Sequence, residues 1–242
     1  DQFAAELEQL AGNEENMKQL LTDILSKEKI VSKLAIALAE KREAGAKSLK
    51  AGVEKELKEL HMNGVRFGVQ FSYPQDPEGF VEYRKEKLKP TPLGLGTLEF
   101  LFSPNPGEDL RPLAKIASGG ELSRIMLALK SILNEQDTIP VMIFDEVDAG
   151  IGGRVAEKVG DKLKKVAETK QIFCITHLPQ IAGMASSHYR VEKHVQGKRT
   201  RSGIRQLEFE ERVEEVARMS SGEKITDASL KHARELILGA GL

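Results

Sequence analysis

Two short apolar runs, each ending abruptly in polar residues, constrain the fold of this sequence more than any other feature. Pro140 to Phe144 is followed at once by two acidic residues, and Gln171 to Thr176 is followed by a histidine. Runs of this length and composition are typical of strands buried on both faces of a parallel sheet. A helical pattern over 154–167 separates them, so the sequence predicts an α/β sheet with crossover helices.

The first 60 residues contain no proline and consist mainly of good helix formers. Apolar residues three and four positions apart form one narrow stripe, flanked by charged side chains. The stripe comprises Met17, Leu20, Leu21, Ile24, Val31, Leu34, Ala35, Leu38, Leu49, Val53, Leu57 and Leu60. This pattern favours a coiled-coil arm, and the alternative is an amphipathic helix pair packed on a globular core. Gly12-Asn13 and Gly45 are candidate breaks.

The remainder of the chain, from 61 to 242, reads as one α/β lobe that follows the helical segment 1–60. Its other predicted strands span 65–71, 97–102, 189–192 and 204–209, and its other predicted helices span 121–133, 212–219 and 227–238. A basic turn over 193–201, with Arg205 beyond it, joins the last two strands. It is either a contact for DNA phosphates or an ordinary solvated hairpin. The turn contains no aromatic residue, which argues against a platform for single-stranded DNA.

The composition excludes several classes of protein. With 242 residues, 40% hydrophobic and 30% charged, the chain can bury a core, so wholesale disorder is excluded. The formal net charge of −1 excludes a uniformly basic protein but leaves room for a local basic patch. The single cysteine, Cys174, excludes an intrachain disulfide and fits a reducing cytosol. We find no apolar stretch of membrane-spanning length and no signal-peptide pattern, so a cytoplasmic protein is expected.

The first candidate site is Ser118-Gly119-Gly120-Glu121, which directly precedes an apolar-periodic helix. Backbone N–H groups at the positive end of a helix dipole suit a phosphate, and glycine allows a close approach. On its own, a Gly-Gly pair before a helix is more often a turn with a cap.

Acidic residues mark the second candidate site, at the end of the run Val141–Phe144. Asp145 and Glu146 would lie at the carboxyl tip of a buried strand, where ligands of α/β sheets usually bind. Asp145 can hold a hydrated Mg²⁺ there, and Glu146 can orient or deprotonate an attacking water. The alternative is an acidic cap on a strand.

The third candidate is His177, which follows the run that ends at Thr176. A histidine at a strand tip can contact a phosphate, although a lone histidine is more often structural. The order of the three sites along one α/β unit makes a phosphate-handling role the favoured interpretation of all three.

With these motifs in this order, the sequence resembles the ABC-type ATPases. Residues 117–121 look like their signature motif, Val141–Asp145 like their Walker B strand and His177 like their switch histidine, and Asp148-Ala149-Gly150 falls at their D-loop. Val147 stands where a transporter subunit usually has proline, which disfavours a transporter. The longer runs 115–130, 144–153 and 175–182 are similar to the RecN family of bacterial SMC-like DNA repair proteins, and the resemblance covers nearly the whole chain.

The resemblance implies a set of roles. Ser118, Gly119, Gly120 and Glu121 would face ATP bound by a second head, with ATP sandwiched between two heads. On its own head, Asp145 would act on Mg²⁺ through water, Glu146 as general base and His177 as a γ-phosphate contact. Asp148 would link the two sites across the dimer. The implied setting is DNA double-strand-break repair and recombination at the bacterial nucleoid, with double-stranded DNA or its ends as partner.

One motif of this class is absent from the sequence. The phosphate loop Gly-x-x-x-x-Gly-Lys-Ser/Thr does not occur, since Gly197-Lys198 has no glycine five positions earlier. The resemblance places that loop in an N-terminal lobe, so the chain would be the returning arm and the C-terminal lobe. Its start at Asp1 rather than Met fits a piece of a longer protein, which alone would be inactive. The alternative is a non-catalytic coiled-coil scaffold that bridges DNA or partner proteins.

Overall fold

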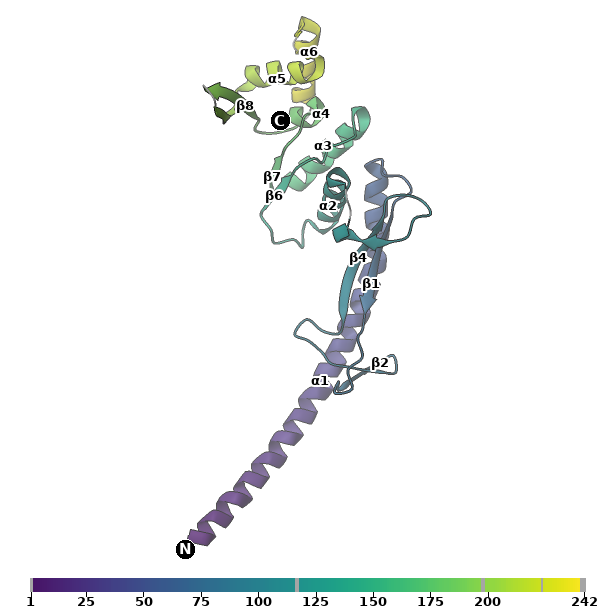
Figure 1. The fold of residues 1–242 in the computed structure, drawn as a ribbon, viewed down its shortest axis with the longest axis vertical. Coiled ribbons are helices and arrows are strands. Elements are labelled where there is room, and N and C mark those ends of the chain that lie inside the picture. The colour runs from purple at the N-terminus through teal and green to yellow at the C-terminus, as the bar shows by residue number, and fades with distance from the viewer. Residues whose placement is uncertain (1, 116–117, 197–198, 223, 240–242) are drawn as a thin grey trace. The chain divides into compact units, whose positions relative to one another are not determined.

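The structure, a computed structural model, describes residues 2–115, 118–196, 199–222 and 224–239. Ala117 of the signature-like run and Gly197-Lys198 of the basic turn lie outside the described residues. The chain forms two compact units, one of residues 1–50 and 68–101 and one of residues 51–67 and 102–242. Figure 1 identifies their elements by label and colour. The division into an arm over 1–60 and a lobe over 61–242 stays a prediction.

Helix α1 spans Gln2–Glu59 without interruption, so neither Gly12 nor Gly45 breaks it. A glycine in a helix costs about 1 kcal/mol relative to alanine, which the surrounding strong helix formers offset. The apolar stripe has two parts with different surroundings. From Met17 to Leu34 its large side chains are exposed, whereas Val53, Leu57 and Leu60 are fully buried in the second unit.

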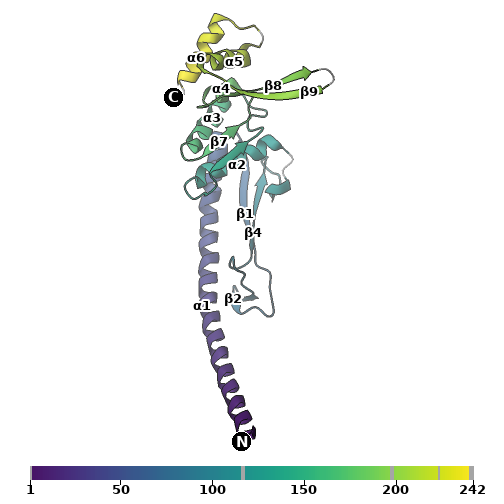
Figure 2. The ribbon, with the colours of Figure 1, turned by 90° about the vertical axis from the view of Figure 1, so that its left-hand side faces the viewer.

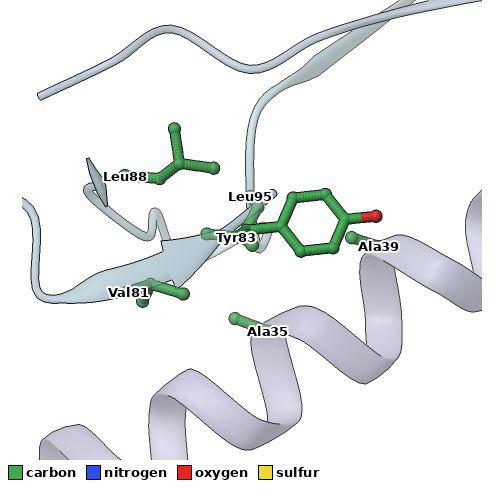
Figure 3. Close-up of a cluster of buried hydrophobic side chains, with 6 residues drawn as sticks. All are labelled: Ala35, Ala39, Val81, Tyr83, Leu88 and Leu95. Atoms are coloured by element: carbon green, nitrogen blue, oxygen red, sulfur yellow. The ribbon is translucent and has the colours of Figure 1, made fainter. Parts of the chain in front are cut away.

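In the first unit, a small antiparallel pair covers one face of α1. Strand β2 (Val81–Tyr83) pairs with β3 (Glu86–Leu88). The buried cluster between them and the helix consists of Ala35, Ala39, Val81, Tyr83, Leu88 and Leu95. Figure 3 shows the two alanines facing these side chains, and their small size lets the pair approach the helix. Glu43 accepts hydrogen bonds from the Tyr73 hydroxyl at 2.9 Å and from Arg84 at 2.6 Å.

A larger side chain at Ala39 is expected to destabilise the first unit. Ala39 is 2% exposed and lies in the cluster, so Ala39→Leu must displace β2 and β3, at a cost of about 1–3 kcal/mol. Ala37 is exposed on the same helix, and Ala37→Leu is the matched control. Thermal unfolding and proteolysis within 68–101 measure the effect. Equal behaviour of the two variants would contradict the packing described here.

In the second unit, β6 (Val141–Phe144) and β7 (Gln171–Cys174) pair in parallel, with Phe144 opposite Cys174. Helix α3 (Gly153–Ala167) connects them and packs on β7, and it also contacts helix α2 (Gly119–Leu133). The predicted α/β crossover is therefore confirmed.

The prediction that these strands are buried on both faces is wrong. Met142 and Phe144 are buried, but Ile143 is 71% exposed and Phe173 is 46% exposed. The reason is that helices of the described chain cover one face of the two-stranded sheet, while the other face is uncovered. The apolar residues of the uncovered face are Val141, Ile143, Phe173 and Ile175.

The C-terminal part of the second unit is a helical cluster with a projecting hairpin. Helices α4 (Pro179–Gly183), α5 (Phe209–Ser221) and α6 (Asp227–Gly239) pack around Ala182, Val216 and Ile237. Strand β8 (Tyr189–Gln196) pairs in antiparallel fashion with β9 (Arg199–Gln206), and Figure 2 shows this hairpin along its length. The second strand begins earlier than predicted and ends at Gln206, because α5 begins at Phe209.

A three-stranded sheet completes the described chain. Its order is β1 (Arg66–Ser72), β4 (Thr97–Ser103) and β5 (Arg111–Pro112), and a single 3₁₀ turn, Leu113–Lys115, leads toward α2. The sequence predicted β1 and β4 but missed β2, β3, β5 and α4. Each of the missed elements has five residues or fewer, too few for a periodic pattern.

Candidate functional site

The start of α2 forms the first part of the candidate site. Ser118 is the N-cap in an extended conformation, and its hydroxyl accepts a hydrogen bond from the Glu121 backbone N–H at 3.4 Å. Serine is a favoured cap because its oxygen satisfies a donor that the helix leaves unpaired. Ser118 and Gly119 are exposed. The exposed positive end of a 15-residue helix is therefore available to an anion.

The second part is the turn that follows β6. Asp145 and Glu146 are exposed at the carboxyl tip of the strand, and the Glu146 N–H donates to Asp145 Oδ1 at 2.9 Å. Glu146 has φ of 56°, in the left-handed region that a non-glycine residue rarely adopts. Such backbone strain is found where the surrounding structure fixes a residue, often at a functional site.

These two parts touch each other. A Cβ atom added to Gly119 would collide with Glu146 Oε2, and one added to Gly120 would lie 2.8 Å from the Ala149 side chain. The Ser123 hydroxyl donates to the Asp145 carbonyl at 2.6 Å. Glycine is thus required at position 120 for a steric reason, because a Cβ atom there would meet a β-carbon and a backbone carbonyl of the turn after β6.

A buried arginine joins α2 to the same turn. Nη1 of Arg124 donates to the carbonyl of Ala149 at 2.9 Å and to that of Val147 at 3.3 Å. Burial lowers the pKa of the Arg124 guanidinium, and the carboxylates of Glu121 and Asp148 oppose that shift. Arginine stays charged in proteins despite such a shift, so Arg124 places a positive charge next to the turn that follows β6.

The third part is the tip of β7. The Ile175 N–H continues the parallel pairing by donating to the Phe144 carbonyl at 2.9 Å, so the tips of β6 and β7 are adjacent. Asp148 is buried and lies directly beside Thr176 and His177. The His177 side chain is 71% exposed. Cys174 precedes them, and burial with the nearby Asp148 and Asp145 carboxylates raises the pKa of its thiol to about 12, which disfavours the thiolate.

The structure therefore brings the three motifs predicted from the sequence into one lobe. Gly119 and Gly120 lie against Glu146, and Asp148 lies against His177. Sequence reasoning assigned no role to Ser123, Arg124 or Thr176. Ser123 and Arg124 follow Gly119 and Gly120 by one helical turn, and that spacing is the signal that could have found them. Among the described residues, no three His, Cys, Asp or Glu side chains are grouped to hold a metal ion.

No protein-family model matches the chain. The chain is 37% identical over 234 residues to the DNA repair protein RecN of Bacillus subtilis, covering 96% of this chain and 41% of the relative. RecN of Treponema pallidum is 41% identical over 232 residues, covering 96% and 39%. RecN of Rickettsia prowazekii is 43% identical over 205 residues, covering 85% and 35%.

Solved structures show a weaker likeness. The Smc head domain with a coiled coil and joint from Pyrococcus yayanosii aligns with a TM-score of 0.47 at 18% identity, covering 76% of this chain and 30% of that one. The head domain of the SMC protein from Thermotoga maritima aligns with a TM-score of 0.34 at 22% identity, covering 66% and 47%.

The parallel β6–β7 pair and its crossover helix define the class as an α/β lobe of an ABC-type head. Within that class, the chain belongs to the RecN family of DNA repair proteins and corresponds to a C-terminal portion of its members. It spans about two fifths of the length of the curated relatives it matches. No helix in the described ranges is long and apolar enough to cross a membrane.

Proposed function

We propose that this chain supplies part of an ATP-hydrolysing site in an SMC-like protein that acts in DNA double-strand-break repair and recombination. The observation that carries the proposal is the junction of α2, the turn after β6 and the tip of β7 in one hydrogen-bonded lobe. It brings together a helix start suited to an anion, two carboxylates and an exposed imidazole, which are some of the parts that phosphoryl transfer to water uses.

Each residue has a role in this proposal. Ser118, Gly119 and Gly120 contact the γ-phosphate of ATP held by a second head, through backbone N–H groups and a hydroxyl. Glu146 takes a proton from the attacking water, and His177 contacts the γ-phosphate on its own head. Most of the rate would come from positioning and electrostatic stabilisation.

The residues present fit a hydrated Mg²⁺ rather than a closed metal site. Mg²⁺ usually keeps several waters and is held by one or two carboxylates together with substrate phosphates. Asp145 is an exposed carboxylate at the strand tip, which matches that donor set. Such an ion would neutralise charge on the phosphates, while Asp145 orients one of its waters.

The chain needs a second lobe to complete the nucleotide site. It has no phosphate loop, and it leaves the apolar face of the β6–β7 sheet uncovered. Apolar sheet faces of this kind are normally covered in a folded domain. We propose that the lobe carrying the phosphate loop, from the same protein, packs on this face. A mixture of the two lobes is expected to hydrolyse ATP, whereas this chain alone is not.

A charge on the uncovered sheet face should prevent that assembly. Ile143 is 71% exposed here, so Ile143→Asp should leave this chain folded but make burial against another lobe costly. We expect ATPase activity of the mixed lobes to fall at least about tenfold, since 1.4 kcal/mol of lost affinity suffices. Leu238 is 60% exposed on α6, and Leu238→Asp serves as the control. Full activity with Ile143→Asp would exclude this face as the docking surface.

The arm and the DNA contact complete the proposed assembly. The exposed stripe from Met17 to Leu34 suits a coiled-coil partner helix, and two heads would form a homodimer around ATP. DNA would bind the assembled dimer at the nucleoid. The β8–β9 hairpin contributes less to that surface than its sequence suggests. Arg205 pairs with Glu211 and Arg190 pairs with Glu192 and Glu215, so part of its charge is neutralised.

The second candidate function is a non-catalytic scaffold that bridges DNA or partner proteins. The uncovered apolar stripe of α1 favours it, because a coiled-coil partner can bind there without any nucleotide. Size measurements of the full protein with and without ATP separate the two candidates. Association that requires ATP supports the ATPase, and association that is indifferent to ATP, together with no hydrolysis, supports the scaffold.

A further inference from the structure

We propose that Asp148 is a positioning residue for His177. In this role it keeps the proton of the neutral imidazole on Nδ1 and directs Nε2 away from the lobe. The inference rests on the proposed function only for the use of His177 at a γ-phosphate. The orientation of the ring itself is a property of this chain and can be tested without nucleotide.

The geometry around Asp148 carries the inference. Its Oδ2 atom accepts hydrogen bonds from the Thr176 hydroxyl at 2.5 Å and from the His177 backbone N–H at 2.9 Å. Nδ1 of His177 lies 3.1 Å from the same oxygen. The Asp148 side chain is 4% exposed, whereas that of His177 is 71% exposed. One buried oxygen thus meets the hydroxyl, the main chain and the ring at the tip of β7.

The Asp148 carboxylate determines which ring nitrogen of a neutral His177 carries the proton. A carboxylate can only accept a hydrogen bond, so a neutral imidazole must present N–H at the nitrogen that faces it. The hydrogen bond made by one ring nitrogen determines which nitrogen carries the proton. Nδ1 therefore carries it, and Nε2 keeps its lone pair on the exposed side. Without the carboxylate, an imidazole in water favours the opposite tautomer.

The position of Asp148 is itself fixed from two sides. The carbonyls on either side of it, those of Val147 and Ala149, both accept from Nη1 of Arg124. Arg124 stands on α2, six residues after the Ser118 cap. The turn that carries Asp148 is thus tied to α2, and its side chain is tied to β7. A shift of α2 would be passed on to the imidazole through these contacts.

The burial of Asp148 also bears on the role that the family resemblance implied for it, a link between the two sites across the dimer. A side chain that is 4% exposed, already accepts two hydrogen bonds and lies 3.1 Å from the His177 ring nitrogen offers little surface to a second head. The same contacts are what a residue needs in order to orient a neighbouring imidazole, as the aspartate of a catalytic triad does. The structure therefore favours a role for Asp148 within its own lobe.

Nitrogen NMR on the full-length protein that contains this chain tests the inference directly. With ¹⁵N-labelled histidine, and with His177→Gln to assign the signal, the shifts of Nδ1 and Nε2 report the tautomer. We expect mainly Nδ1–H in the unmodified protein and a shift toward Nε2–H in Asp148→Ala. Asp148→Asn keeps an oxygen that can accept from Thr176, so it guards against unfolding and should show a smaller shift. A mainly Nε2–H ring in the unmodified protein would overturn the inference.

Kinetics provide a second readout that a merely structural role would not give. We expect kcat for ATP hydrolysis to fall about 10- to 100-fold in Asp148→Ala, by analogy with the loss seen when a partner that orients a metal-ligating imidazole is removed. KM for ATP should change by less than about threefold, because binding is largely unaffected. Asp161 is an exposed carboxylate on α3, and Asp161→Asn is the control. A tautomer that stays unchanged in the folded Asp148 variants refutes the positioning role, whether or not the protein hydrolyses ATP.

Discussion

Replacing Glu146 by glutamine is expected to lower ATP turnover of the full-length protein by about 10²- to 10⁴-fold, the usual contribution of a general base. Glutamine keeps the shape of the side chain but cannot take a proton from water. The fold should survive, because the backbone N–H of Glu146 bonds to Asp145 and its carbonyl accepts from Ala149 N–H. Phosphate release at saturating ATP measures the loss.

The same variant should still form ATP-dependent dimers, since it leaves the proposed contacts to ATP unchanged. Light scattering with and without ATP measures this association. Glu157 is an exposed glutamate on α3, and Glu157→Gln is the control. Undiminished turnover with Glu146→Gln would remove Glu146 from the role of general base. Lost dimerisation together with lost turnover would point to a structural role instead.

The second large effect is expected at Gly120, where even a methyl group does not fit. A Cβ atom there would lie 2.8 Å from the Ala149 side chain and 3.0 Å from the Glu146 carbonyl, neither of which is a flexible chain end. Gly120→Ala should destabilise the lobe by about 1–3 kcal/mol, as overpacking does. The higher helix propensity of alanine offsets at most about 1 kcal/mol of this.

The displacement of α2 should also weaken ATP-driven association. Moving the start of α2 shifts the backbone N–H groups that we propose to contact the phosphate, and a loss of about 1.4 kcal/mol there lowers affinity about tenfold. Gly152 is the matched control, because a Cβ atom there meets nothing within 4 Å. Thermal unfolding and light scattering separate the two effects. Normal stability and association of Gly120→Ala would show that α2 does not cross the turn this closely.

Much of the fold could be read from the sequence. The apolar runs ending at Phe144 and Thr176 gave the two parallel strands, and the long proline-free pattern gave α1. The uncovered face of the sheet could not be predicted, because an apolar run shows that a strand is built for burial but not whether its cover is in the same chain. The burial of Ala35 and Ala39 under β2 and β3 could not be predicted either, because a helical pattern does not show which distant segment covers the helix.

The candidate site was likewise predictable only in part from the sequence. Ser118, Gly119, Glu146 and His177 could be singled out, since their residue types and order suit phosphate chemistry. Their contacts could not, because Arg124 meets Ala149 across 25 positions and Thr176 meets Asp148 across 28 positions of the chain. Residues so far apart in the sequence come into contact only through the pairing of β6 with β7 and the packing of α2.

The sequence by itself determined the class of this protein, through local patterns that need no partner to be recognised: a helix start rich in glycine, a strand ending in carboxylates and a strand ending in histidine. Only the tertiary structure decided what these residues do to one another. It placed Gly120 where a methyl group does not fit and buried Asp148 against His177. The physical reason is that periodicity and residue type act over a few positions, whereas burial and hydrogen-bond partners depend on which distant segments fold together.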